Sequence, residues 1–213
     1  MNKSCFLRAL ILLVVLSVTP VFAQTKKSRC KIGNTTYICL KDFRKLASVD
    51  STTDLFRTGK GDDLLYLFVA IPSGPFDDTK IRETIAGYYS KSEQSKFKWK
   101  SVKDPLAMDI DTKYTSKLVS NFGIADQFLL EVKFFKFDVK GSEIVIGYAS
   151  NIGYTNESGN AEIVNRALFD KGEGLSDSAV GCNAVATILN SITKEFKEKD
   201  QGCTLTVLSS PKL

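Results

Sequence analysis

The chain of 213 residues contains five cysteines and no histidine, and these two facts limit the chemistry that it can perform. Catalytic triads of the Ser-His-Asp type, Cys-His nucleophiles and histidine-ligated zinc hydrolases all require an imidazole ring. General acid–base catalysis would therefore fall to carboxylates, lysine or tyrosine. We see no convincing catalytic constellation of these groups and assign no catalytic residue.

Acidic residues are the remaining candidates for catalysis or metal binding. Asp109 and Asp111 are two residues apart and are predicted to share one side of an extended segment. Together with Glu131, they are the acids that a carboxylate-based hydrolase would use. Two oxygens at this spacing could also begin a calcium site, to which Asp77 and Asp78 could contribute, but the glycine and glutamate of an EF-hand loop are missing. We expect no metal and no cofactor, and interpret these aspartates as solvated or helix-capping acids.

The clearest candidate for a ligand-binding face is a short segment in which aromatic and basic residues alternate. Phe97 and Trp99 fall on one face of the predicted strand, and Lys98 and Lys100 fall on the other. Exposed aromatic rings next to lysines can stack on sugars or bases. Alternating strands commonly bury their aromatic face instead, so core packing is the alternative interpretation.

Residues 1–23 have the pattern of a secretory signal peptide. Lys3 and Arg8 form a positive start, and an apolar run from Ala9 to Val18 follows. The run is shorter than the ~20 residues that cross a bilayer, which disfavours the alternative of an uncleaved membrane anchor. We expect cleavage before Gln24 and a soluble mature chain without a transmembrane segment, located in the periplasm or secreted.

Cleavage would remove Cys5 and leave four cysteines. An even number in an exported chain favours disulfides, and no pair has the C-x-x-C spacing of a redox or metal site. Cys30 and Cys39 flank a Gly-Asn turn, so a hairpin could bring them together. Cys182 lies early in a predicted helix and Cys203 begins the strand after it. We therefore predict the bridges Cys30–Cys39 and Cys182–Cys203.

The charge of the chain argues against nucleic acid as a partner. The net charge of +5 falls to +3 when Lys3 and Arg8 are removed with the signal peptide, which is a mild value. Part of the positive charge is gathered just after the predicted cleavage point, in Lys26, Lys27, Arg29 and Lys31. This basic head could contact an anionic surface or polymer, or it could be a solvated terminus.

Hydrophobic patterning predicts the elements that must position these residues. A continuous apolar run is typical of a buried central strand at Leu64–Ile71. Other strands are predicted at Phe97–Val102, Phe128–Val139, Glu143–Ser150, Ala161–Asp170 and Cys203–Leu208. Helices are predicted at Asp77–Ser92, Thr112–Asn121 and Ser176–Lys199. The polar stretch Ser48–Asp63 is predicted to be a loop, and a bulge is predicted near Phe134 and Phe135.

This order of elements predicts an α+β fold, in which two or three helices pack on a mostly antiparallel sheet and a disulfide-stapled hairpin lies at the N-terminus. We divide the chain into the signal peptide (1–23), a region of basic head, hairpin and loop (24–60) and an α+β domain (61–213). Residues 24–213 are expected to form one structural unit.

The function most compatible with these observations is that of a non-enzymatic exported protein, which binds another macromolecule or a small ligand or stays at the cell envelope. One alternative is the carboxylate-based hydrolase. Another is a carrier that encloses a small apolar ligand between the apolar faces of the Phe128–Val139 meander and the last helix. No motif points to a known family.

Overall fold

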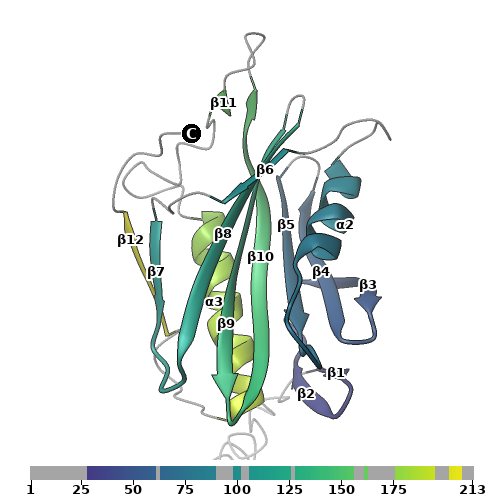
Figure 1. The fold of residues 1–213 in the computed structure, drawn as a ribbon, viewed down its shortest axis with the longest axis vertical. Coiled ribbons are helices and arrows are strands. Elements are labelled where there is room, and N and C mark those ends of the chain that lie inside the picture. The colour runs from purple at the N-terminus through teal and green to yellow at the C-terminus, as the bar shows by residue number, and fades with distance from the viewer. Residues whose placement is uncertain are drawn as a thin grey trace, which may run out of the picture.

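The computed structural model describes residues 28–60, 63–89, 98–101, 106–125, 128–155, 161–162, 176–194 and 202–207. Within these ranges the chain forms one large antiparallel sheet, two two-stranded sheets and two helices (Figure 1). The expectation of a mostly antiparallel sheet with an N-terminal stapled hairpin is confirmed. Neither of the helices in the described ranges is long and apolar enough to cross a membrane.

The large sheet has eight strands, of which seven follow the order β3-β4-β5-β10-β9-β8-β6, and β11 pairs with the end of β10. The strands are β3 (Arg44–Asp50), β4 (Thr53–Lys60), β5 (Asp63–Ala70), β6 (Lys98–Ser101), β8 (Ser116–Ala125), β9 (Phe128–Val139), β10 (Ser142–Thr155) and β11 (Ala161–Glu162). The predicted central strand is confirmed, because β5 lies between β4 and β10. Lys140 and Gly141 both have positive φ in the two-residue turn that joins β9 to β10, which is typical of a tight hairpin.

Both faces of this sheet are buried. Helix α3 (Ser176–Thr193) packs on one side and helix α2 (Thr79–Tyr89) on the other (Figure 1). Along β9, Phe135 and Phe137 contribute to the core under α3, whereas Val132 and Phe134 contribute to the core under α2. We call these two sides the α3 face and the α2 face. Strands buried on both sides are apolar at nearly every position, as β5 is.

The N-terminal hairpin consists of β1 (Arg29–Ile32) and β2 (Thr35–Ile38) and lies on the α3 face. The Cys30–Cys39 disulfide closes it, with the two Cα atoms 5.2 Å apart. The Ile38 amide donates a hydrogen bond of 3.0 Å to Ser191 Oγ of α3. The hairpin is therefore fixed to the helix as well as closed on itself.

A second small sheet pairs β7 (Leu106–Ile110) with β12 (Cys203–Val207). The Cys182–Cys203 disulfide, with 5.9 Å between the Cα atoms, ties β12 to α3. Both bridges thus have the pairing expected from the spacing of the cysteines. Met108 and Ile110 of β7 pack into the core of the α3 face.

Two predicted elements are wrong. The residues predicted as a helix at Thr112–Asn121 lie largely in β8, where pairing with β9 satisfies the backbone and side chains alternate between the two faces. The stretch predicted as a loop at Ser48–Asp63 is instead the hairpin of β3 and β4 and the start of β5. Its Ser, Thr and Asp residues are typical of loops, but strand pairing places Thr53 and Asp54 in the interior, where Asp54 has polar partners.

The predicted bulge near Phe134 and Phe135 is also wrong. Pairing of β9 with both of its neighbours is regular there, and the register shift lies in β10 between Asn151 and Gly153. The predicted strand at Ala161–Asp170 is described only for its first two residues, which form β11. Its remainder, like Phe97, lies outside the described residues.

A buried hydrogen bond anchors the hairpin to the large sheet. The Tyr37 hydroxyl donates to Asp54 Oδ2 at 2.7 Å. Asp54 Oδ1 in turn accepts from Ser48 Oγ at 2.9 Å and lies 2.7 Å from Lys45 Nζ. Burial and the adjacent Asp54 carboxylate raise the pKa of Tyr37 well above its ordinary value.

The raised pKa of Tyr37 predicts how stability depends on pH. We expect Tyr37→Phe to lower the free energy of unfolding by about 1.5–3 kcal/mol near neutral pH, because a hydrogen bond to a charged group is lost. This difference should shrink as pH rises above about 10, because Tyr37 ionises in the unfolded wild type while the folded protein keeps its proton. Urea unfolding of both proteins from about pH 8 to pH 11 measures it. A difference that stayed constant over this range would contradict the raised pKa.

Candidate functional site

An ion pair lies inside the molecule, on the α3 face of β9. Lys133 Nζ is 2.7 Å from Glu131 Oε1, and the two side chains are only 1% and 3% exposed. Residues two apart on a strand point to the same side, which is why these charges meet. The same alternation explains why β9 needs no bulge to accommodate them.

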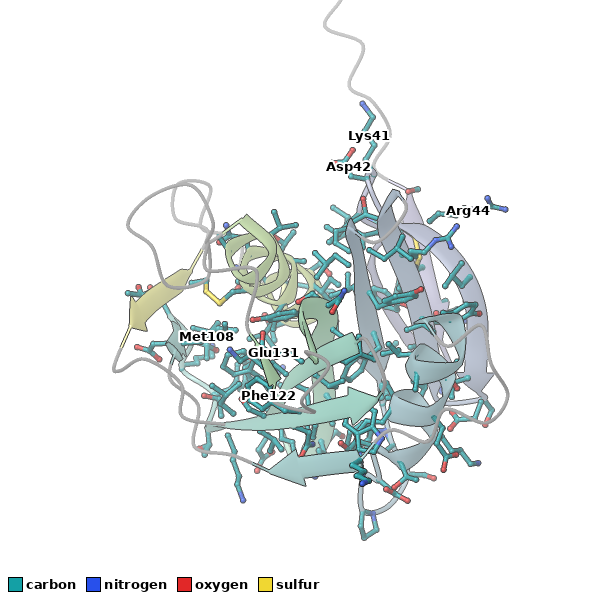
Figure 2. All side chains as sticks on the ribbon, turned by 90° about the horizontal axis from the view of Figure 1, so that it is seen from above. Lys41, Asp42, Arg44, Met108, Phe122 and Glu131 are labelled. Atoms are coloured by element: carbon teal, nitrogen blue, oxygen red, sulfur yellow. A yellow bond between two sulfur atoms is a disulfide. The ribbon has the colours of Figure 1, made fainter. Side chains whose placement is uncertain are left out.

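The strands on either side surround this pair with further polar and aromatic groups. In the sheet register, Phe122 and Ser150 lie opposite Glu131, and Ser120 and Tyr148 lie opposite Lys133. All four side chains are buried. Ser150 Oγ has no hydrogen-bond partner among the described residues. Figure 2 shows Phe122 and Glu131 near Met108 on the side of the sheet that α3 covers.

Helix α3 and strand β7 close over this cluster through Tyr148. The Tyr148 hydroxyl donates to the sulfur of Met108 at 3.3 Å. Gly181 of α3 lies directly on the tyrosine ring, and a Cβ atom there would come within 2.5 Å of a ring carbon. Glycine at this position therefore sets how closely the helix approaches the sheet.

The opposite charges of Glu131 and Lys133 limit the reactions in which either side chain could take part. Glu131 and Lys133 neutralise each other, and their attraction offsets part of the cost of removing both charges from water. A carboxylate hydrolase of the expected kind would need Glu131 to work with a second acid. Asp109 and Asp111 do not supply one in this arrangement: Met108 and Ile110 turn inward from β7, and the two aspartates are exposed.

The other acidic candidates have structural partners. Asp77 accepts hydrogen bonds from the amide and the hydroxyl of Thr79, at 3.0 and 2.7 Å, where α2 begins. These bonds lower the pKa of Asp77. Asp78 is 2.8 Å from the Arg82 Nε and accepts a bond of 2.8 Å from Asn121. The described residues contain no group of three or more side chains that could hold a metal ion.

The segment predicted as a ligand-binding face lies partly within the described residues. Trp99 is half-buried on the α2 face, where its ring lies against Gly123, and the Arg82 guanidinium is 5.1 Å from the ring centre. Lys98 is exposed. Phe97 and the side chain of Lys100 lie outside the described residues.

Basic side chains gather at the hairpin and the turn that follows it. Arg29, Lys31, Lys41 and Arg44 are exposed, and Asp42 is the acidic residue among them. Figure 2 shows Lys41, Asp42 and Arg44 at the same edge of the molecule, with the Lys41 and Arg44 side chains directed away from it. We call the four exposed basic residues the basic end.

An open groove of about 370 Å³ lies where β8 begins and β9 turns into β10. Lys117 and Lys136 face each other across the two strands that line it. Glu143 approaches Lys136 to 4.0 Å, a long distance for an ion pair. The groove thus carries charges of both signs, and it lacks the enclosed apolar walls typical of a small-molecule site.

Sequence reasoning identified some of these residues and missed others. It named Glu131 but not Lys133, although two charges two apart in an apolar strand are a recognisable signal of a buried pair. It named Arg29 and Lys31 but not Lys41 and Arg44, which lie in and after the turn that follows the hairpin.

Comparison with known proteins assigns no function to this arrangement. No protein-family model matches the sequence, and no curated protein is significantly similar to it.

The buried ion pair predicts a strongly non-additive pair of substitutions. Glu131→Gln or Lys133→Met alone should each lower the free energy of unfolding by about 3–5 kcal/mol, because each leaves one charge buried without its partner. The double variant should lose much less than the sum of the two. Urea unfolding of the four proteins measures the coupling. Additive effects, or single variants that cost less than about 1 kcal/mol, would contradict a tightly coupled pair.

Proposed function

We propose that this protein is an exported, non-catalytic binding protein. The observation that carries the proposal is the separation of the acids that a hydrolase would need. Glu131 is buried and paired with Lys133, whereas Asp109 of β7 and Asp111, which follows the end of β7, are exposed. Since a pair of carboxylates must flank the same bond to act as acid and base, this arrangement supports binding over hydrolysis.

Two independent features support export to an oxidising compartment. The first 23 residues have the pattern of a signal peptide. The described residues hold two disulfides, Cys30–Cys39 and Cys182–Cys203, and such bridges persist in secreted and periplasmic proteins. Each should stabilise the fold by about 3 kcal/mol in the chain-entropy account.

The alternative of a carrier for small apolar ligands receives less support. A carrier would need space between α3 and the sheet. In the described part of that interface, Val185, Ile188 and Leu189 of α3 are buried in one core with Phe135 and Ile146 of the sheet. Side chains packed in this way favour a solid core.

We also assign residues 24–213 to one α+β unit. The support comes from β3 and β4, which belong to the N-terminal part of the chain and pair into the same sheet as β5. Helix α2 lies between β5 and β6 in the chain and α3 lies between β11 and β12, and each helix packs on the antiparallel sheet.

A turnover assay tests the proposal. The mature protein and an Asp109→Asn/Asp111→Asn variant should be incubated with fluorogenic glycoside, ester and peptide substrates. We expect neither protein to release product above the buffer rate. The two aspartates are exposed, so the variant should fold and serve as a matched comparison. Saturable turnover by the wild type that the variant loses would overturn the proposal in favour of the hydrolase.

A further inference from the structure

Charge is distributed unevenly along this chain. Residues 28–45 contain five basic residues and one acidic residue, whereas residues 46–213 contain 20 basic and 23 acidic residues. The short N-terminal segment thus has a net charge of +4 and the long remainder has −3. The net positive charge of these residues is therefore concentrated in the segment that contains the basic end, whereas the remainder is slightly negative.

The fold presents these charges on rigid backbone. Arg29 and Lys31 share the outer side of β1, about 7 Å apart, while Cys30 between them is bonded to Cys39. The Phe43 amide donates to the Leu40 carbonyl at 3.1 Å, and both of these side chains pack into the α3-face core. That turn directs Lys41 outward. A surface already ordered loses little conformational entropy when it binds.

The chemistry of the surface indicates which kind of anion it suits. Arg29 and Arg44 carry guanidinium groups, which bind carboxylate, phosphate and similarly shaped sulfate groups through two parallel hydrogen bonds. Thr36 is exposed opposite Lys31 and adds a hydroxyl group. A protein that binds a membrane surface would also present apolar side chains to the lipid. The large apolar residues that are exposed in the described ranges are Tyr88 and Val180, and neither belongs to the hairpin.

We propose that the basic end is a docking surface for an acidic polysaccharide, with Arg29, Lys31, Lys41 and Arg44 contacting its carboxylate or sulfate groups. This inference rests on the proposed binding function and names the partner. Binding should weaken as salt is added, because exposed charges are screened over about 10 Å at 0.1 M ionic strength.

Two triple variants with the same change in net charge test this surface. Arg29→Gln/Lys31→Gln/Lys41→Gln removes charge from the basic end, and Lys80→Gln/Lys117→Gln/Lys140→Gln removes it from exposed positions elsewhere. Binding of the mature protein to heparin is measured by calorimetry and by the salt needed to elute it from a heparin column. We expect the first variant to bind about tenfold more weakly and the second to differ from wild type by less than about twofold.

The other possible results of these binding experiments would overturn different parts of the proposal. Equal weakening in both variants would indicate attraction to net charge alone and would overturn the docking surface. Binding to phosphatidylserine vesicles but not to heparin would overturn the polysaccharide as partner, while leaving non-catalytic binding intact. Absence of binding to both would also overturn this inference. Cleavage of the polysaccharide, seen as a loss of chain length on incubation, would overturn the proposed function itself.

Discussion

The burial of both faces of the large sheet is the constraint on which the rest of the structure depends. Helix α3, the hairpin and β7 cover one side and α2 covers the other, so a charged side chain that lies beneath these layers, as those of Glu131 and Lys133 do, is shielded from water. It must find a partner inside, because an isolated buried charge is very costly. Glu131 with Lys133, and Asp54 with Tyr37 and Lys45, meet this requirement.

Because both faces of the sheet are covered, the buried charged groups stabilise the fold and are not accessible to a ligand. Among the described residues, the buried carboxylates of Glu131 and Asp54 have structural partners, whereas Asp109 and Asp111 are exposed. What the fold leaves available for recognition is its surface, where the hairpin concentrates positive charge. The disulfide, the Tyr37–Asp54 hydrogen bond and the Ile38–Ser191 hydrogen bond all hold that hairpin in place. These three anchors, of which the Tyr37–Asp54 hydrogen bond is buried, give a defined shape to a short two-stranded hairpin that would be marginal alone.

Local signals in the sequence were sufficient for some elements and misleading for others. Three elements were predictable because neighbouring residues determine their structure. They are the apolar run of β5, the turn at Lys140 and Gly141, and the capped start of α2. The strand β8 and the hairpin of β3 and β4 were not, because their polar residues favour helix or loop until a distant strand pairs with them. Lys133 is different, because its spacing from Glu131 in an apolar strand is a local signal of a buried pair that the sequence already contains.

The most direct test of this account is to map the binding surface on the protein. Backbone amide chemical shifts of the isotope-labelled mature protein should be followed by NMR during titration with a heparin oligosaccharide. The account predicts that the largest changes occur at Arg29, Lys31, Lys41 and Arg44, with the amides of Glu131 and Tyr148 unchanged. Changes centred on Glu131 and Tyr148, with the basic end unaffected, would mean that the buried cluster is the functional site and would contradict the account.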